Sequence, residues 1–134
     1  MKTLSISVLL TLALTLAACG GGNSHEALMQ ASVGQMTKFA EALEGVKDKA
    51  SWEATKPKLE SVLTEMESIG KKVKALGEPD EATKKAIGDA MTKQMGDVQQ
   101  RLMQASMKVM QVEGIGEDVG KFMTNFRERM KSTK

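Results

Sequence analysis

The sequence is poor in the side chains that most catalytic sites require. Its 134 residues include one cysteine, one histidine and no tyrosine, and only 3% are aromatic. The histidine, His25, follows the cysteine, Cys19, by six positions. Close carboxylates such as Glu65 and Glu67 are sequence neighbours that diverge around a helix, so they do not form a shared acid-base site. We therefore expect a protein that is not an enzyme and that holds no cofactor.

A large excess of charge of one sign is also lacking. The chain has 19 basic and 17 acidic residues, and one basic residue, Lys2, precedes Cys19. Nucleic-acid binding requires clustered Lys and Arg, and single strands also need aromatic side chains on which bases stack. Neither feature is present, so we expect no nucleic-acid partner.

No apolar run is long enough to cross a membrane. The longest extends from Leu4 to Leu16, which is shorter than the roughly 20 residues of a spanning helix, and it contains four Ser or Thr residues. Its length and its basic start at Lys2 are typical of a signal peptide. The alternative interpretations of this run are an ordinary secretory signal and a membrane-spanning helix.

The end of this run is the most informative motif in the chain. Leu16-Ala17-Ala18-Cys19 resembles the lipobox of a bacterial lipoprotein. The resemblance implies that residues 1–18 are a cleaved signal peptide, that the Cys19 sulfur carries a diacylglycerol, and that the freed amine is acylated as well. One acyl chain holds a protein to a membrane only weakly, whereas two or three make attachment close to permanent. Lipidation would consume Cys19 and leave no thiol for a disulfide.

Residues 19–24 are expected to be the lipidated cysteine and a flexible, glycine-rich tether. Five residues at about 3.3–3.6 Å each reach no more than roughly 18 Å, so the folded part would lie close to the membrane. In Gram-negative lipoproteins, an Asp directly after the lipidated Cys commonly retains the protein at the inner membrane. Gly20 occupies that position, so the resemblance implies a lipid-anchored protein of the outer membrane that faces the periplasm.

Beyond the tether, apolar residues recur with a helical period and no segment alternates as a strand does. We expect residues 25–134 to form one domain, with helices over about 25–44, 52–76, 81–112 and 117–130. Ser24, Ser51 and Asp80 are suitable N-caps, and Gly77-Glu78-Pro79-Asp80 predicts a tight helical hairpin. Short connections between amphipathic helices predict an all-α, antiparallel four-helix bundle.

This mature part resembles small all-helical bacterial envelope proteins of unknown function. The shared features are a Ser-led second helix with Lys56-Pro57-Lys58-Leu59, the Gly-Glu-Pro-Asp hairpin, and a Gly114-Ile115-Gly116 link to the last helix. The resemblance implies a helical bundle and carries no catalytic signature.

Methionine, in contrast, is abundant, with 11 residues. Met103, Met107 and Met110 fall within about 60° of one another on the helix face opposite the apolar stripe that runs from Ile87 to Val112. Thioethers are soft ligands that suit Cu(I) and Ag(I), so these three residues are candidate metal ligands. Further sulfur or nitrogen donors could come from the pair Met91 and Met95, or from His25 and Met29.

Packing is the alternative interpretation of the three methionines, because Met commonly fills gaps between helices. Packing predicts that Met103, Met107 and Met110 are buried under another helix. Metal binding predicts that they are accessible and within about 4 to 5 Å of one another.

The sequence leaves three functional hypotheses. The first is a membrane-anchored, non-enzymatic lipoprotein whose bundle is a structural module or binds an envelope protein partner, with the methionine face as the candidate contact surface. The second is a periplasmic protein that binds or senses a soft metal ion through Met103, Met107 and Met110. The third is a carrier of a small amphiphile, which requires an enclosed apolar cavity.

Overall fold

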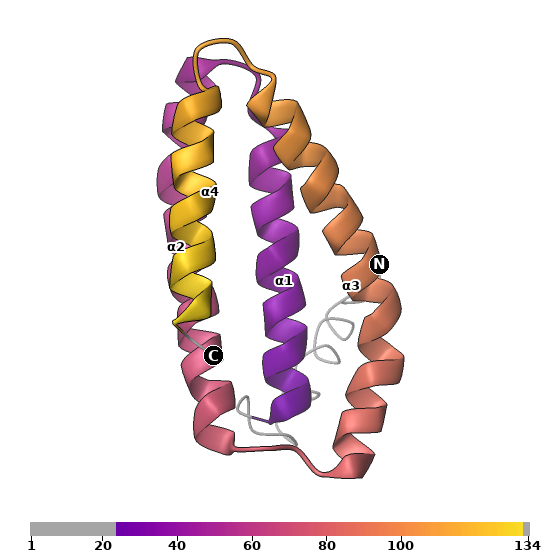
Figure 1. Ribbon diagram of the computed structural model, residues 1–134. Coiled ribbons are helices and arrows are strands. Elements are labelled where there is room, and N and C mark those ends of the chain that lie inside the picture. Colours follow the sequence, from indigo (N-terminus) through magenta and orange to yellow (C-terminus); the bar gives the residue numbers. More distant parts are fainter. Residues whose placement is uncertain (1–23, 133–134) are drawn as a thin grey trace, which may run out of the picture.

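The computed structural model describes residues 24–132, which form four helices (Figure 1). These are α1 (His25–Glu44), α2 (Lys49–Leu76), α3 (Glu81–Met110) and α4 (Gly116–Lys131), with no strand in this part of the chain. Successive helices run in opposite directions. Helix α1 lies between α2 and α3 and packs against both, whereas the backbones of α2 and α3 do not come close to each other. The prediction of an all-α bundle is confirmed. The predicted signal peptide (1–18), Cys19 and the tether up to residue 23 lie outside the described residues.

Two of the three predicted N-caps are present as expected. The Ser24 hydroxyl oxygen accepts a hydrogen bond from the backbone amide of Ala27 at 3.2 Å, at the start of α1. The Asp80 carboxylate accepts one from the amide of Thr83 at 2.7 Å, at the start of α3. Each bond satisfies an amide that has no partner within its helix, which fixes where the helix begins.

The prediction that Ser51 is the N-cap of the second helix was wrong. Helix α2 begins at Lys49 rather than 52, and its N-cap is Asp48. The Asp48 carboxylate accepts from the Ser51 amide at 2.7 Å, and the Ser51 hydroxyl oxygen accepts in return from the Asp48 amide at 3.0 Å. This reciprocal capping box places Ser51 third in the helix. Pro57 lies inside α2 and does not end it.

The link between α3 and α4 also differs slightly from the prediction. Helix α3 ends at Met110 instead of 112, because the amide of Val112 bonds the carbonyl of Val109 at 3.1 Å in a tighter turn. Gly114 has φ of +80°, which allows the chain to reverse. Helix α4 then extends from 116 to 131 rather than from 117 to 130.

The core is divided along the length of the bundle. The larger cluster lies around the end at which α1 joins α2, and it includes Phe39, Leu43, Trp52, Val109 and Val119 from all four helices. A smaller buried cluster of Val33, Met91 and Val98 joins α1 to α3. Four helices therefore contribute to the core in one half of the bundle, whereas only α1, α2 and α3 run along the other half.

This division follows from the helix lengths. At about 1.5 Å per residue, the 16 residues of α4 span about 24 Å, whereas the 28 residues of α2 span about 42 Å. Figure 1 shows α4 alongside α2 and ending partway down it.

Charged side chains fix α4 to α2 at two levels. Trp52, which is fully buried, donates its indole N–H to Asp118 at 2.8 Å, and Lys56 pairs with the same carboxylate at 2.5 Å. Two guanidinium nitrogens of Arg129 bond Glu67 at 2.7 and 3.0 Å, and a third bonds Glu60 at 2.6 Å. Phe39 of α1 also packs its ring against Phe126 of α4, with centroids 4.9 Å apart. Helix α4 is therefore docked on the bundle.

Candidate functional site

The three candidate methionines form an exposed stripe on α3. Met103, Met107 and Met110 are 60, 57 and 56% exposed. The opposite face of the same helix carries the buried residues Val98, Ala105 and Val109, as the helical period predicted. The interpretation of the stripe as packing within the bundle is therefore wrong. Among the four described helices, none covers the stripe, because α4 leaves α3 through a tight turn and docks on α2.

This exposure is unusual for the described part of the chain. The only other large hydrophobic side chain exposed there is Leu76, at 41%, and it lies at the end of α2. Scattered exposed apolar residues need no explanation, whereas a contiguous group indicates a contact surface. We refer to Met103, Met107 and Met110 together as the methionine stripe.

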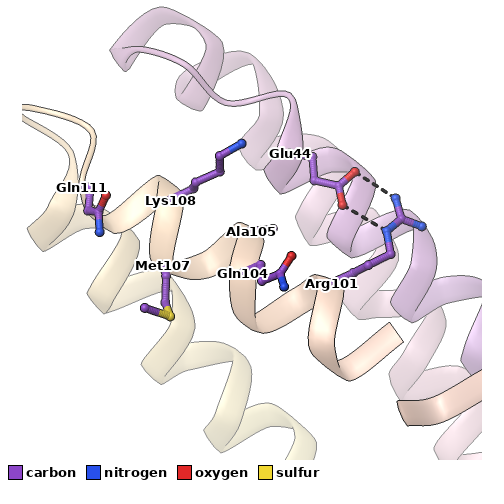
Figure 2. A pocket seen from close by; sticks show the side chains of 7 residues that line it. All are labelled: Glu44, Arg101, Gln104, Ala105, Met107, Lys108 and Gln111. Atoms are coloured by element: carbon purple, nitrogen blue, oxygen red, sulfur yellow. Dashed lines mark hydrogen bonds and ion pairs between the residues drawn. The ribbon is translucent and has the colours of Figure 1, made fainter. Parts of the chain in front are cut away.

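A surface hollow of about 430 Å³ adjoins the methionine stripe. Figure 2 shows the residues that line it, with Arg101 of α3 paired to Glu44 of α1 and the side chain of Met107 pointing away from that pair. Gln104, Lys108 and Gln111 supply further polar groups. Apolar thioethers thus lie beside amide and cationic groups, as in the core and rim of a protein interface.

The Arg101 and Glu44 pair sets the electrostatics of this hollow. Two guanidinium nitrogens contact the two carboxylate oxygens at 3.1 and 2.8 Å. This hydrogen bonding lowers the pKa of Glu44 below its usual value, and Lys108 contributes to the shift by its charge. The carboxylate is therefore ionised at neutral pH and unsuited to general acid catalysis.

The further metal donors suggested by the sequence do not gather at the methionine stripe. Met91 is buried beside Val33 and Val98, and Met95 packs against the same cluster. Met91 precedes Met103 by 12 residues, which is about 18 Å along a helix. Within residues 24–132, no group of three or more His, Cys, Asp and Glu side chains could hold a metal ion. Any metal bound at the stripe would therefore depend on its three thioethers.

His25, the other suggested donor, has a structural contact instead. Its Nε2 atom lies 2.8 Å from the backbone oxygen of Gly77, which connects the start of α1 to the end of α2. It is half-buried at the opposite end of the bundle from the α3–α4 link. His25 is therefore far from the methionine stripe, which lies near the α3–α4 link.

A second apolar feature was missed by the sequence reasoning. Where α4 ends, a groove of about 500 Å³ opens between α1 and α2. Its apolar lining comes from Met66, Ile69 and Val73 of α2 and from Met130 of α4, with Ser32 on the α1 side. The predicted helix lengths contained the relevant signal, because a last helix of about 14 residues cannot cover a partner of about 25.

The groove also bears on the amphiphile-carrier hypothesis. Both hollows are open to solvent, whereas that hypothesis requires an enclosed cavity. Neither of these two hollows therefore encloses a ligand as that hypothesis requires.

Comparisons with known proteins add no functional assignment. No protein-family model, curated protein or solved structure matches the chain. Among the helices of residues 24–132, none combines the length and the hydropathy that a membrane span needs.

Proposed function

We propose that this protein is a non-enzymatic, membrane-anchored envelope lipoprotein whose helical bundle binds a protein partner through the methionine stripe. One observation carries the proposal. Three long apolar side chains remain 56–60% exposed on α3, and the other exposed residues of that helix are polar or small.

Burial of the methionine stripe against a partner stabilises the complex. Full burial of a methionine side chain is worth about 1.5–3 kcal/mol, and the share that belongs to the exposed 56–60% of each residue is unused in the isolated bundle. Thioether side chains are flexible, so they adapt to a partner surface. The neighbouring Arg101, Gln104, Lys108 and Gln111 provide the polar rim that specific recognition needs.

The anchoring part of the proposal is supported by the lipobox resemblance at Cys19 and by the short tether that follows it. Intact-mass measurement of the protein purified from bacterial membranes tests this part. We expect the mass of the chain from Cys19 onward plus its lipid, and we expect Cys19→Ala to abolish the lipid and release the protein from the membrane fraction. An unmodified Cys19 would contradict the proposal.

Site-directed crosslinking tests the contact surface. A photoreactive amino acid in place of Gln104, which lines the hollow beside the stripe, should capture one envelope protein in intact cells. Adding Met103→Gln, Met107→Gln and Met110→Gln should abolish the adduct. Leu76→Gln is the matched control, since it removes the other exposed apolar side chain and should leave the adduct intact. Equal crosslinking in both variants would refute the assignment.

A second candidate function is Cu(I) or Ag(I) binding, which the accessibility of the three thioethers favours. A Cu(I) titration in competition with a chelator distinguishes it from protein binding. Changing all three methionines to Leu removes the sulfur ligands and keeps an apolar surface. The variant should lose metal binding if the stripe is a metal site, and should keep the crosslinked partner if the stripe is a protein contact.

A further inference from the structure

The groove beyond the end of α4 has a largely apolar wall and shares one lining residue with a second hollow. Met66, Ile69 and Val73 form its α2 wall, and Met130 lines both this groove and an adjacent hollow of about 400 Å³ along α4. Met123 and Phe126 supply the apolar surface of that second hollow. Met130 therefore lies between two hollows, both open to solvent, at the end of α4.

The groove between α1 and α2 extends to the start of α1. Gly77 and Pro79 line the groove, and the backbone oxygen of Gly77 lies 2.8 Å from Nε2 of His25, the first residue of α1. The chain that leads back from Ser24 to Cys19 therefore starts at this end. Five residues reach at most roughly 18 Å, so a group attached to Cys19 is held near the groove.

We propose that one acyl chain attached to Cys19 lies in the groove between α1 and α2. This inference rests on the proposed lipidation of Cys19. An acyl chain is linear, flexible and wholly apolar, which matches an open groove whose apolar wall includes the adaptable thioethers of Met66 and Met130. Because the groove is open along its length, the chain enters without separating the helices.

The short tether favours the protein's own acyl chain over a free fatty acid. A short flexible linker holds a tethered ligand at a millimolar effective concentration, which excludes a free competitor present at lower concentration. The polar side chains of Lys74 and Glu78, which also line the groove, lie close in sequence to Gly77 and thus near the tethered end. The remaining acyl chains stay in the membrane and hold this end of the bundle against it.

The experiment uses lipidated full-length protein from cells fed a palmitate that carries a photoreactive diazirine. Intact mass first establishes whether Cys19 carries lipid, which tests the proposed function separately. After illumination in phospholipid vesicles, peptide mapping locates the adducts. We expect them on the α2 segment 66–73.

Two variants three residues apart provide the comparison. Val73→Asp places a charge in the groove and should reduce these adducts at least fivefold. Leu76→Asp places the same charge on an exposed residue outside the groove and should leave them unchanged. Ser32→Phe, which fills the groove with an apolar ring, is a second disrupting variant if Val73→Asp lowers helicity.

Added diazirine-palmitate distinguishes an acyl chain attached to Cys19 from a free fatty acid. Unlipidated protein, residues 20–134, should be labelled on the same α2 segment by added diazirine-palmitate, whereas lipidated protein should not. Equal labelling of both forms would show an unoccupied groove and overturn the proposal. Adducts confined to vesicle lipid, or equal loss in Val73→Asp and Leu76→Asp, would overturn it as well.

Discussion

Four glycines illustrate how the same residue type has opposite consequences at different positions. Gly77 and Gly114 have φ of +76° and +80°, in the left-handed region that side chains rarely adopt. Gly88 and Gly96 lie inside α3, and a Cβ added to either would meet no atom within 4 Å. Gly88 and Gly96 therefore weaken α3 without allowing another segment to approach its backbone closely.

We predict that Gly88→Ala and Gly96→Ala each stabilise the protein by about 0.5–1 kcal/mol, because Ala loses less backbone entropy in a helix. Gly77→Ala and Gly114→Ala should each destabilise it by about 1 kcal/mol, because Ala is strained at positive φ. Urea unfolding followed by circular dichroism at 222 nm measures all four. A destabilising Gly88→Ala or Gly96→Ala would show that these positions have a partner that residues 24–132 do not contain.

At the same scale, sequence reasoning placed the methionine stripe correctly on the non-core face of α3 but chose the wrong N-cap for α2. Asp48 and Ser51 are both good capping residues, and the reciprocal pair of hydrogen bonds decides between them. Local spacing identifies candidates for a cap. The hydrogen bonds that form decide which candidate adopts the extended backbone of an N-cap.

Helix α4 docks through both apolar and charged side chains. Val119 is its one fully buried residue, and Phe122, Met123, Phe126 and Met130 pack against the core while partly buried. Hydrogen bonding by Arg129 lowers the pKa of Glu67, and hydrogen bonds from Lys56 and then Trp52 lower the pKa of Asp118. The ion pairs that Glu67 and Asp118 form between α4 and α2 exist only while these carboxylates are ionised.

We predict that acid releases α4 before the rest of the bundle unfolds. The folded pKa values of Glu67 and Asp118 lie below their unfolded values of about 4, so docking is fully stabilised above that pH. This stabilisation is lost as the pH falls through the lower, folded values. Amide hydrogen exchange near pH 3 should show loss of protection in α4 while α1 and α2 remain protected.

A matched pair of variants tests whether the ion pairs of Arg129 control the acid release of α4. Arg129→Lys keeps the charge and loses the planar fork that bonds Glu67 and Glu60, so α4 should lose protection at a higher pH. Arg127→Lys, at an exposed position on the same helix, should match the original protein. Identical acid profiles for the two variants would contradict the role of Arg129.

At the scale of the whole molecule, the two halves of the bundle differ in their cores. The half that α4 covers has 11 buried hydrophobic residues in one cluster, and the other half has the cluster of Val33, Met91 and Val98. Fewer buried contacts mean a lower free energy of local opening. The first half of α3 also contains Gly88, and Gly96 lies at its middle.

We predict that residues 81–96 of α3 exchange their amide hydrogens through local opening, whereas residues 102–110 exchange only when the whole protein unfolds. Native-state exchange in low urea, read by mass spectrometry of peptides, distinguishes the two mechanisms by their urea dependence. One common opening free energy along α3 would contradict this division.

Amide exchange also tests the acyl chain in the groove. The α2 segment 66–73 should be more protected in lipidated protein than in the unlipidated form if an acyl chain occupies the groove.

The sequence by itself determined which segments are helices, where they begin and end to within three residues, and which face of each is apolar. These properties depend on interactions within a few residues, such as the caps at Ser24 and Asp80 and the break at Gly77-Glu78-Pro79. Only the tertiary structure decided which apolar faces are covered. Met103, Met107 and Met110 stay exposed and a groove opens beside Val73, because burial depends on the length and docking of α4, a helix distant in the sequence.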